Sequence, residues 1–244
     1  MTDYDLQFYD KDALLDRLSD GVKESGKEVV FVVGSPITAP YGTRNFGVAN
    51  VQAVVDLIRE QFTAKPNRLS VLDAELTKSD NRYQAAFKFL SGARGQDAAN
   101  KIVKQAVAGA LIAKPDQDWK DVICKLSDDQ VADLDRDFGC WHLSPGANAL
   151  GQLIAEFPDV FGRALVTSNF DPLMEVAISR NGGTSWRTSL SVDGPLDIST
   201  ANGCQVIHIH GYWHGSDTLH TGQQLLAGRP TLKNSLLKLL EDKI

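Results

Sequence analysis

Four polar side chains follow a short apolar run in the middle of this 244-residue chain. The run, residues 164–166, is typical of a buried strand. Amide, hydroxyl and carboxylate groups at its end can hydrogen-bond a ligand or position an attacking water molecule. Pro172 suits the first turn of a helix, so the preceding Asp171 is also a candidate helix cap. The four side chains are those of Thr167, Ser168, Asn169 and Asp171.

A histidine and a glycine end a second run, residues 205–211, in which apolar and polar side chains alternate. This pattern predicts a strand with His210 and Gly211 at its end. Ligands of open α/β sheets bind beyond the carboxyl ends of parallel strands, so Asn169 and His210 are expected to face each other across a crevice. The residues alone leave a second interpretation open, in which Asp171 caps an ordinary turn and His210 is a hydrogen-bonded edge residue.

The amino-terminal part of the chain contains a third candidate segment. Residues 28–34 form a β-branched and aromatic run ending in glycine, which predicts a central strand covered on both faces. A loop rich in proline, glycine and hydroxyl groups follows over 35–47, and then a helix over 48–62. Dinucleotide folds use this order to present backbone N–H groups to a pyrophosphate. Because no G-x-G-x-x-G is present, a plain connecting loop is the alternative.

A sheet and several helices must hold these three segments. We predict an α/β fold, in which a Rossmann-like parallel sheet is flanked by helices and a helical insertion separates the first strand from the Asn169 strand. The insertion covers about 64–140, an edge strand is expected over 186–192, and 219–228 is expected to be a loop. Apolar periodicity predicts further helices over 9–23, 82–90, 96–113 and 230–240, a short acidic helix from 127, and helices that extend to 157 and 178.

Composition narrows the class of protein. Apolar residues make up 43% of the chain and charged residues 23%, which are ordinary values for a globular domain. A net charge of −6 argues against a dominant nucleic-acid-binding surface. The chain has neither a membrane-spanning apolar run nor a signal peptide, so we expect a cytoplasmic protein. The three cysteines are isolated and the histidines have no carboxylate cluster beside them, so no metal site is expected.

In order and spacing, the three segments resemble the sirtuin superfamily, and more narrowly the sirtuin-like domains of bacterial anti-phage defence proteins. Residues 29–38 resemble the glycine-rich nucleotide loop, 167–171 the Thr-Gln-Asn-Ile-Asp segment, and 209–211 the catalytic His-Gly. The resemblance implies a single domain over 1–244, forming the amino-terminal part of a longer protein whose closing strands follow residue 244. Two departures are Pro36, where the family has a second loop glycine, and the absence of cysteine pairs for a zinc ribbon.

The resemblance implies hydrolysis of NAD⁺ to nicotinamide and ADP-ribose by an effector that depletes NAD⁺ during phage infection. Homo-oligomerisation and sensor domains, in the same longer chain or in a partner protein, are implied as well. Asn169 would bind a ribose hydroxyl or the attacking water, and His210 would accept a proton. Asp171 would hold the nicotinamide amide or simply cap its helix. The other expected NAD⁺-binding residues are Gly34, Ser35 and Thr38 on the phosphate side, with Thr167, Ser168 and Gly211.

Two alternatives belong to other classes of function. The first is a regulatory module that binds NAD⁺ or ADP-ribose without cleaving it, which Pro36 favours because proline removes a backbone donor from the loop. The second is an NAD-dependent protein deacylase, which is weakened by the missing zinc ribbon because that ribbon forms one wall of the peptide cleft. Turnover of NAD⁺ distinguishes the first alternative from the hydrolase.

Overall fold

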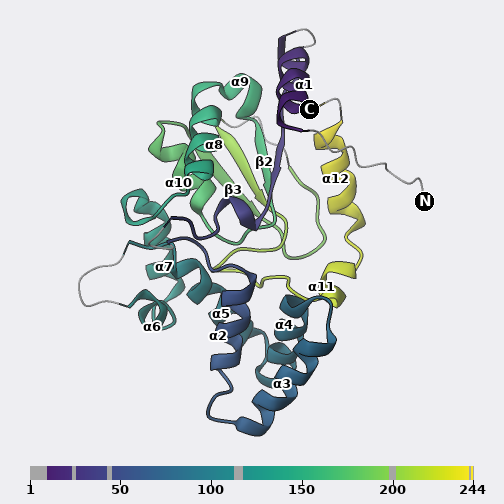
Figure 1. Ribbon diagram of the computed structural model, residues 1–244. Coiled ribbons are helices and arrows are strands. Elements are labelled where there is room, and N and C mark those ends of the chain that lie inside the picture. Colours follow the sequence, from purple (N-terminus) through teal and green to yellow (C-terminus); the bar gives the residue numbers. More distant parts are fainter. Residues whose placement is uncertain are drawn as a thin grey trace.

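A parallel sheet forms the centre of the molecule (Figure 1). The computed structural model describes residues 10–23, 26–42, 46–112, 118–197, 202–241 and 243. Within these residues the sheet has the strand order β1-β2-β4-β3, and every pairing is parallel. This arrangement confirms the predicted Rossmann-like α/β class. The strands are β1 (Phe31–Val33), β2 (Ala164–Thr167), β3 (Ser185–Ser189) and β4 (Cys204–His208).

The register of the sheet brings three loops to one edge. Val33 pairs with Thr167, and Thr167 pairs with His208, so β1, β2 and β4 end level with one another. The hydrogen bond from the Ile209 N–H to the Thr167 carbonyl, at 3.0 Å, continues the pairing just beyond β4. The segments that follow these three strands therefore emerge side by side.

Helices cover both faces of the sheet, because alternate residues of a strand point to opposite sides. Leu165 and Val206 pack against Ile154 of α8 (Pro145–Glu156) and Met174 of α10 (Leu173–Arg180). On the other face, Val166 and Ile207 form an apolar cluster with Leu239 of α12 (Pro230–Leu240). The two central strands, β2 and β4, are buried along their whole length.

The first strand is not central, contrary to the sequence-based prediction. Among the described residues β1 pairs only with β2, and Val32 is 66% exposed. The apolar character of the run is explained by its first residues: Val29 and Val30 are buried before the strand begins, and Val30 joins the cluster under α12. The apolar run therefore reflects the burial of the residues just before β1, and not a central position of β1 in the sheet.

The predicted helical insertion lies between β1 and β2 and builds its own apolar core, which includes Phe62, Leu72, Leu90 and Ile102. In Figure 1 these helices occupy the end of the molecule below the sheet. The insertion carries α3, which sequence periodicity did not predict. Its helices, with the preceding α2, are α2 (Val51–Glu60), α3 (Pro66–Lys78), α4 (Arg82–Arg94), α5 (Gln96–Ala108), α6 (Trp119–Ile123) and α7 (Asp128–Arg136).

Smaller differences from the predicted elements have local causes. The helix predicted over 82–90 continues to Arg94 and ends where Gly95 adopts a φ of +83°. The predicted loop at 219–228 contains a short helix, because Thr221 and Gln224 form a capping box at its start. The helix predicted over 96–113 is too long, because it ends at Ala108 and a turn follows at Gly109; residue 113 itself lies outside the described residues. The remaining helices are α1 (Lys11–Lys23), α9 (Pro158–Phe161), α11 (Gly222–Leu226) and the 3₁₀ turns Ser35–Ile37 and Phe138–Cys140.

Candidate functional site

A cavity of about 340 Å³ lies at the carboxyl ends of β1, β2 and β4, where the sheet meets helices α2, α4 and α5. Its volume is typical of a small-molecule site, and its position is the edge at which parallel α/β sheets bind ligands. Each of the three segments singled out in the sequence contributes to its lining. The contributing residues are Ser35 and Thr38 after β1, Ser168, Asn169 and Asp171 after β2, and His210 after β4.

The Asn169 side chain is held by its amide group. Its Nδ2 donates to Thr38 Oγ1 at 3.0 Å and to the Gly34 carbonyl at 3.4 Å. Because a carbonyl can only accept, the atom that faces Gly34 is the nitrogen and not the oxygen. Both amide hydrogens are thereby used, whereas no donor within the described part of the chain hydrogen-bonds Oδ1. Asn169 therefore offers the cavity an acceptor, suited to a hydroxyl group or a water molecule.

Asp171 is the next member of the same hydrogen-bonded chain. Thr38 Oγ1 donates to its Oδ2 at 3.0 Å, and the Leu173 N–H donates to its Oδ1 at 3.1 Å. The second contact ties Asp171 to the first residue of α10, and the carboxylate also lines the cavity. The predicted helix cap is wrong by one position, because the N-cap residue of α10 is Pro172. Burial raises the pKa of Asp171 to about 6, although both hydrogen bonds act in the opposite direction. The group is therefore mostly ionised at pH 7.

His210 is partly buried beside the same cavity. Burial lowers its pKa, and so does the nearby charge of Arg229, whereas a hydrogen bond with the Ser168 backbone raises it. A hydrogen bond that favours the protonated ring is one that the ring donates, here to a carbonyl. At neutral pH the imidazole is consequently neutral, with one nitrogen donating and the other free to accept a proton. His210 thus meets the chemical requirement for a general base.

An aromatic wall, formed by Tyr83, Phe87, Phe170 and His220, closes the cavity on the side of the insertion. The His220 ring stacks on Phe87 with centroids 3.7 Å apart, and its Nδ1 lies 2.9 Å from the Tyr83 hydroxyl. Burial lowers the pKa of His220 to about 3, so the wall is uncharged. Sequence reasoning missed this wall. The available signal was the spacing of Tyr83 and Phe87, which places both rings on one face of α4.

Three of the predicted NAD⁺-binding residues support the cavity without lining it. Thr167 Oγ1 accepts a hydrogen bond from the Asn169 N–H at 3.0 Å, and Gly34 contributes its carbonyl to the same residue. Gly211 has a φ of +90°, and a Cβ there would lie 2.2 Å from the carbonyl oxygen of Asp217. Gly211 is therefore required because the Asp217 backbone packs against it. The structure does not support the expectation that a ligand approaches this glycine.

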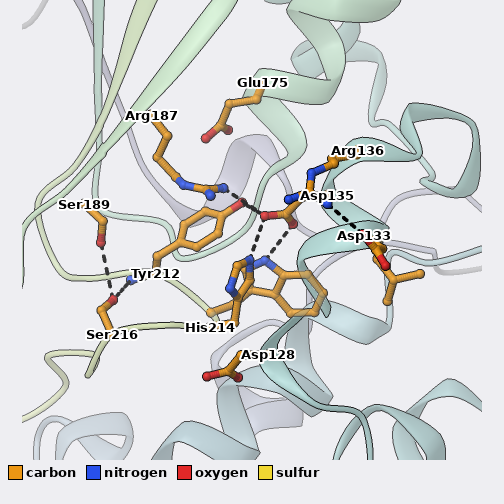
Figure 2. A network of polar contacts seen from close by, with 12 residues as sticks. Asp128, Asp133, Asp135, Arg136, Glu175, Arg187, Ser189, Tyr212, His214 and Ser216 are labelled. Atoms are coloured by element: carbon orange, nitrogen blue, oxygen red, sulfur yellow. Dashed lines mark hydrogen bonds and ion pairs between the residues drawn. The ribbon is translucent and has the colours of Figure 1, made fainter. Parts of the chain in front are cut away.

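A second polar cluster, which the sequence did not reveal, fixes the segment after His210 (Figure 2). Asp135 of α7 accepts hydrogen bonds from Tyr212, Trp213 and His214, at 2.8 to 2.9 Å, and from Arg187 of β3 at 2.9 Å. Burial alone would raise the pKa of Asp135, but the hydrogen bonds and charges of His214 and Arg187 lower it. The carboxylate therefore remains ionised and ties the insertion to the sheet.

The fold and the cavity together define an α/β protein with a Rossmann-like parallel sheet and a cavity at its carboxyl edge. No family model matches the chain, and no curated protein matches it. Within the described ranges, no group of three His, Cys, Asp or Glu side chains is placed to hold a metal ion. None of the helices described is long and apolar enough to cross a membrane.

Proposed function

We propose that the chain binds NAD⁺ in this cavity and hydrolyses the bond between nicotinamide and ribose. The observation that carries the proposal is the convergence of an unpaired acceptor, Asn169 Oδ1, and a neutral imidazole, His210, on one apolar-walled cavity. The resemblance of the three loop segments to sirtuin-like sequences supports the choice of NAD⁺. Asp171, Ser35 and Thr38 complete the polar side of the site.

The reaction needs little covalent chemistry from the protein. When the C–N bond breaks, its electron pair leaves with nicotinamide, which becomes neutral, and positive charge develops on the ribose. A water molecule then forms the new C–O bond, and its proton passes to His210. Asn169 Oδ1 accepts a hydrogen bond from the water or from a ribose hydroxyl and so sets the direction of attack. The products are nicotinamide, ADP-ribose and a proton.

The aromatic wall suits the part of the substrate that becomes uncharged. The Phe87 and His220 rings stack on each other and give the nicotinamide ring an uncharged wall to pack against, and burial of the wall limits the entry of bulk water. A positive charge at His220 would repel the oxidised nicotinamide, and the low pKa of this ring removes that charge at neutral pH.

Nicotinamide release from NAD⁺ by Asn169→Ala and His210→Ala tests the proposal. Each variant should lose about 10²–10⁴-fold in kcat, which is the contribution expected of a positioned acid–base group. Asn148→Ala is the matched control, because Asn148 is exposed on α8, away from the cavity. Turnover that is unchanged in both site variants would contradict the assignment.

A non-catalytic NAD⁺- or ADP-ribose-binding module is the second candidate function. Pro36 favours it, because this residue occupies the 3₁₀ turn after β1 and offers no N–H to a phosphate. Calorimetric binding of NAD⁺ combined with an absence of nicotinamide release would select this function. A protein deacylase is the third, and release of nicotinamide only in the presence of an acylated peptide would select it.

The biological role that we propose is depletion of NAD⁺ in the cytoplasm of a phage-infected bacterium, by an oligomeric effector under the control of sensor domains. It rests on the sequence resemblance together with the proposed activity. Expression of the complete protein should lower cellular NAD⁺ after its trigger, and His210→Ala should prevent the fall. Equal NAD⁺ loss in cells that express the wild-type protein and in cells that express His210→Ala would contradict this role.

A further inference from the structure

A buried histidine and glutamate lie directly behind Asn169, outside the cavity lining. His208, at the end of β4, is fully buried, and its Nδ1 lies 2.8 Å from the backbone carbonyl oxygen of Asn169. On the other side of the ring, Nε2 lies 2.9 Å from Oε1 of Glu175 on α10. A carbonyl can only accept, so Nδ1 carries a hydrogen. A carboxylate can only accept, so the contact with Glu175 calls for a second hydrogen on Nε2.

The surroundings of the ring favour this doubly protonated form. Burial would lower the pKa of His208, but the charge and hydrogen bond of Glu175 and the contact with Asn169 raise it, as does the charge of Asp171. The Tyr212 ring packs edge-on against His208, with centroids 4.9 Å apart. Arg187 lies between Glu175 and Asp135 in Figure 2, so its guanidinium also faces the Glu175 carboxylate.

We infer that His208 and Glu175 are positioning residues for the proposed hydrolysis, and that they fix the Asn169 peptide so that Oδ1 points into the cavity. The inference rests on the proposed function. Asn169 is the second residue after β2, just beyond Ser168, whose N–H still donates to the Val33 carbonyl of β1. Its N–H is anchored by Thr167 and its amide by Thr38, so the contact with His208 supplies the remaining anchor, on the carbonyl.

Packing alone does not account for this pair. Two buried charges lose their hydration, and apolar side chains of similar volume often stabilise a core as well or better. Glu175 also leaves its Oε2 buried without a hydrogen-bond partner among the described residues. A neutral imidazole carries a single N–H and cannot donate to Asn169 and Glu175 together. The arrangement therefore costs stability and in return holds one carbonyl in a fixed direction.

Two substitutions of His208 separate positioning from filling space. His208→Asn places an amide N–H near the position of Nδ1, whereas His208→Leu has similar bulk and no donor. We expect kcat for nicotinamide release to fall about tenfold or less in His208→Asn and about 100-fold or more in His208→Leu, with KM changed less than threefold in both. Equal kcat in the two variants, or a higher kcat in His208→Leu, would overturn the inference.

Glu175→Gln provides a readout that packing would not move. Side-chain ¹⁵N NMR of the wild-type protein should show both His208 nitrogens protonated at neutral pH, and one of them deprotonated in Glu175→Gln. A neutral ring in this variant can carry its single hydrogen on Nε2 and so leave the Asn169 carbonyl without a donor. We therefore expect kcat to fall in Glu175→Gln and to stay unchanged in Glu156→Gln, whose exposed carboxylate lies on α8. A wild-type protein without NAD⁺ turnover means that the proposed function has failed. An active wild type in which His208 Nδ1 carries no hydrogen, or an unchanged kcat in Glu175→Gln, means that the positioning role has failed.

Discussion

At the scale of single residues, the candidate site is defined by which atoms are already occupied. Asn169 uses both amide hydrogens within the fold, so its oxygen remains for a ligand, and His210 uses one ring nitrogen, so the other remains for a proton. The residue types were recognisable from the sequence, because short apolar runs ended in polar groups and glycine. Which atom of each group is free depends on partners such as Thr38, which lies 131 positions away from Asn169.

The pH profile of nicotinamide release should report on His210. The pKa of this ring lies below its usual value of 6.5, chiefly because of burial. The neutral, proton-accepting form therefore predominates at pH 7, and kcat/KM should fall when the pH drops through a midpoint below 6.5. Steady-state rates between pH 5 and pH 8 measure this midpoint. A midpoint above 6.5, or one that persists in His210→Gln, would assign the titration to another group.

Asp171 should make stability depend on pH in the opposite sense from an ordinary carboxylate. Its pKa is about 6 in the fold against 3.8 for the free side chain, so the folded state binds the proton more tightly. This contribution is present at low pH and is lost as the pH rises through about 6. Asp171→Asn should therefore gain about 1 kcal/mol relative to wild type on going from pH 5 to pH 7, measured by urea unfolding. A constant difference between the two proteins would contradict the raised pKa.

At the scale of elements, the sequence predicted the strands of the sheet better than it predicted which helices and loops pack together around them. Apolar runs bounded by glycine and polar residues predicted β1, β2 and β4, and helical periodicity predicted most of the helices. Periodicity shows which face of α4 is buried but not its partner, and the contact between Tyr83 and His220 joins residues 137 positions apart. The edge position of β1 was missed for a related reason, since an apolar run does not say which neighbours cover it.

The Asp135 cluster provides the element-scale prediction, because it connects α7 with β3 and with the segment after His210. Asp135→Asn removes the charge that pairs with Arg187 and an acceptor that Tyr212, Trp213 and His214 share, so the free energy of unfolding should fall by about 3 kcal/mol. Asp133→Asn is the matched control on the same helix. Its carboxylate pairs with Arg136 at the surface and should be worth roughly 0–1 kcal/mol. Similar losses in the two variants would show that the cluster does not join these elements.

At the scale of the whole molecule, the cavity is the junction between the sheet and the helical insertion. His220 connects the two parts, because it follows the last sheet strand and contacts Tyr83 and Phe87 of α4. Its ring is buried and uncharged, so the junction requires a neutral histidine. Protonation of His220 at low pH should therefore weaken the contact between the sheet and the insertion.

His220 should make the fold sensitive to acid. Its pKa is about 3 in the folded protein and 6.5 in a free side chain, so the unfolded chain binds a proton that the folded chain excludes. The stabilising contribution is present above 6.5 and declines as the pH falls below this value, by about 2 kcal/mol between pH 7 and pH 5. His220→Phe keeps the stacking on Phe87 but cannot titrate. It should be less stable than wild type at pH 7, because the Tyr83 and Thr218 hydroxyls lose their partner. Urea unfolding at both pH values should nevertheless show a smaller loss on acidification in His220→Phe, whereas an equal loss would place the acid-sensitive group elsewhere.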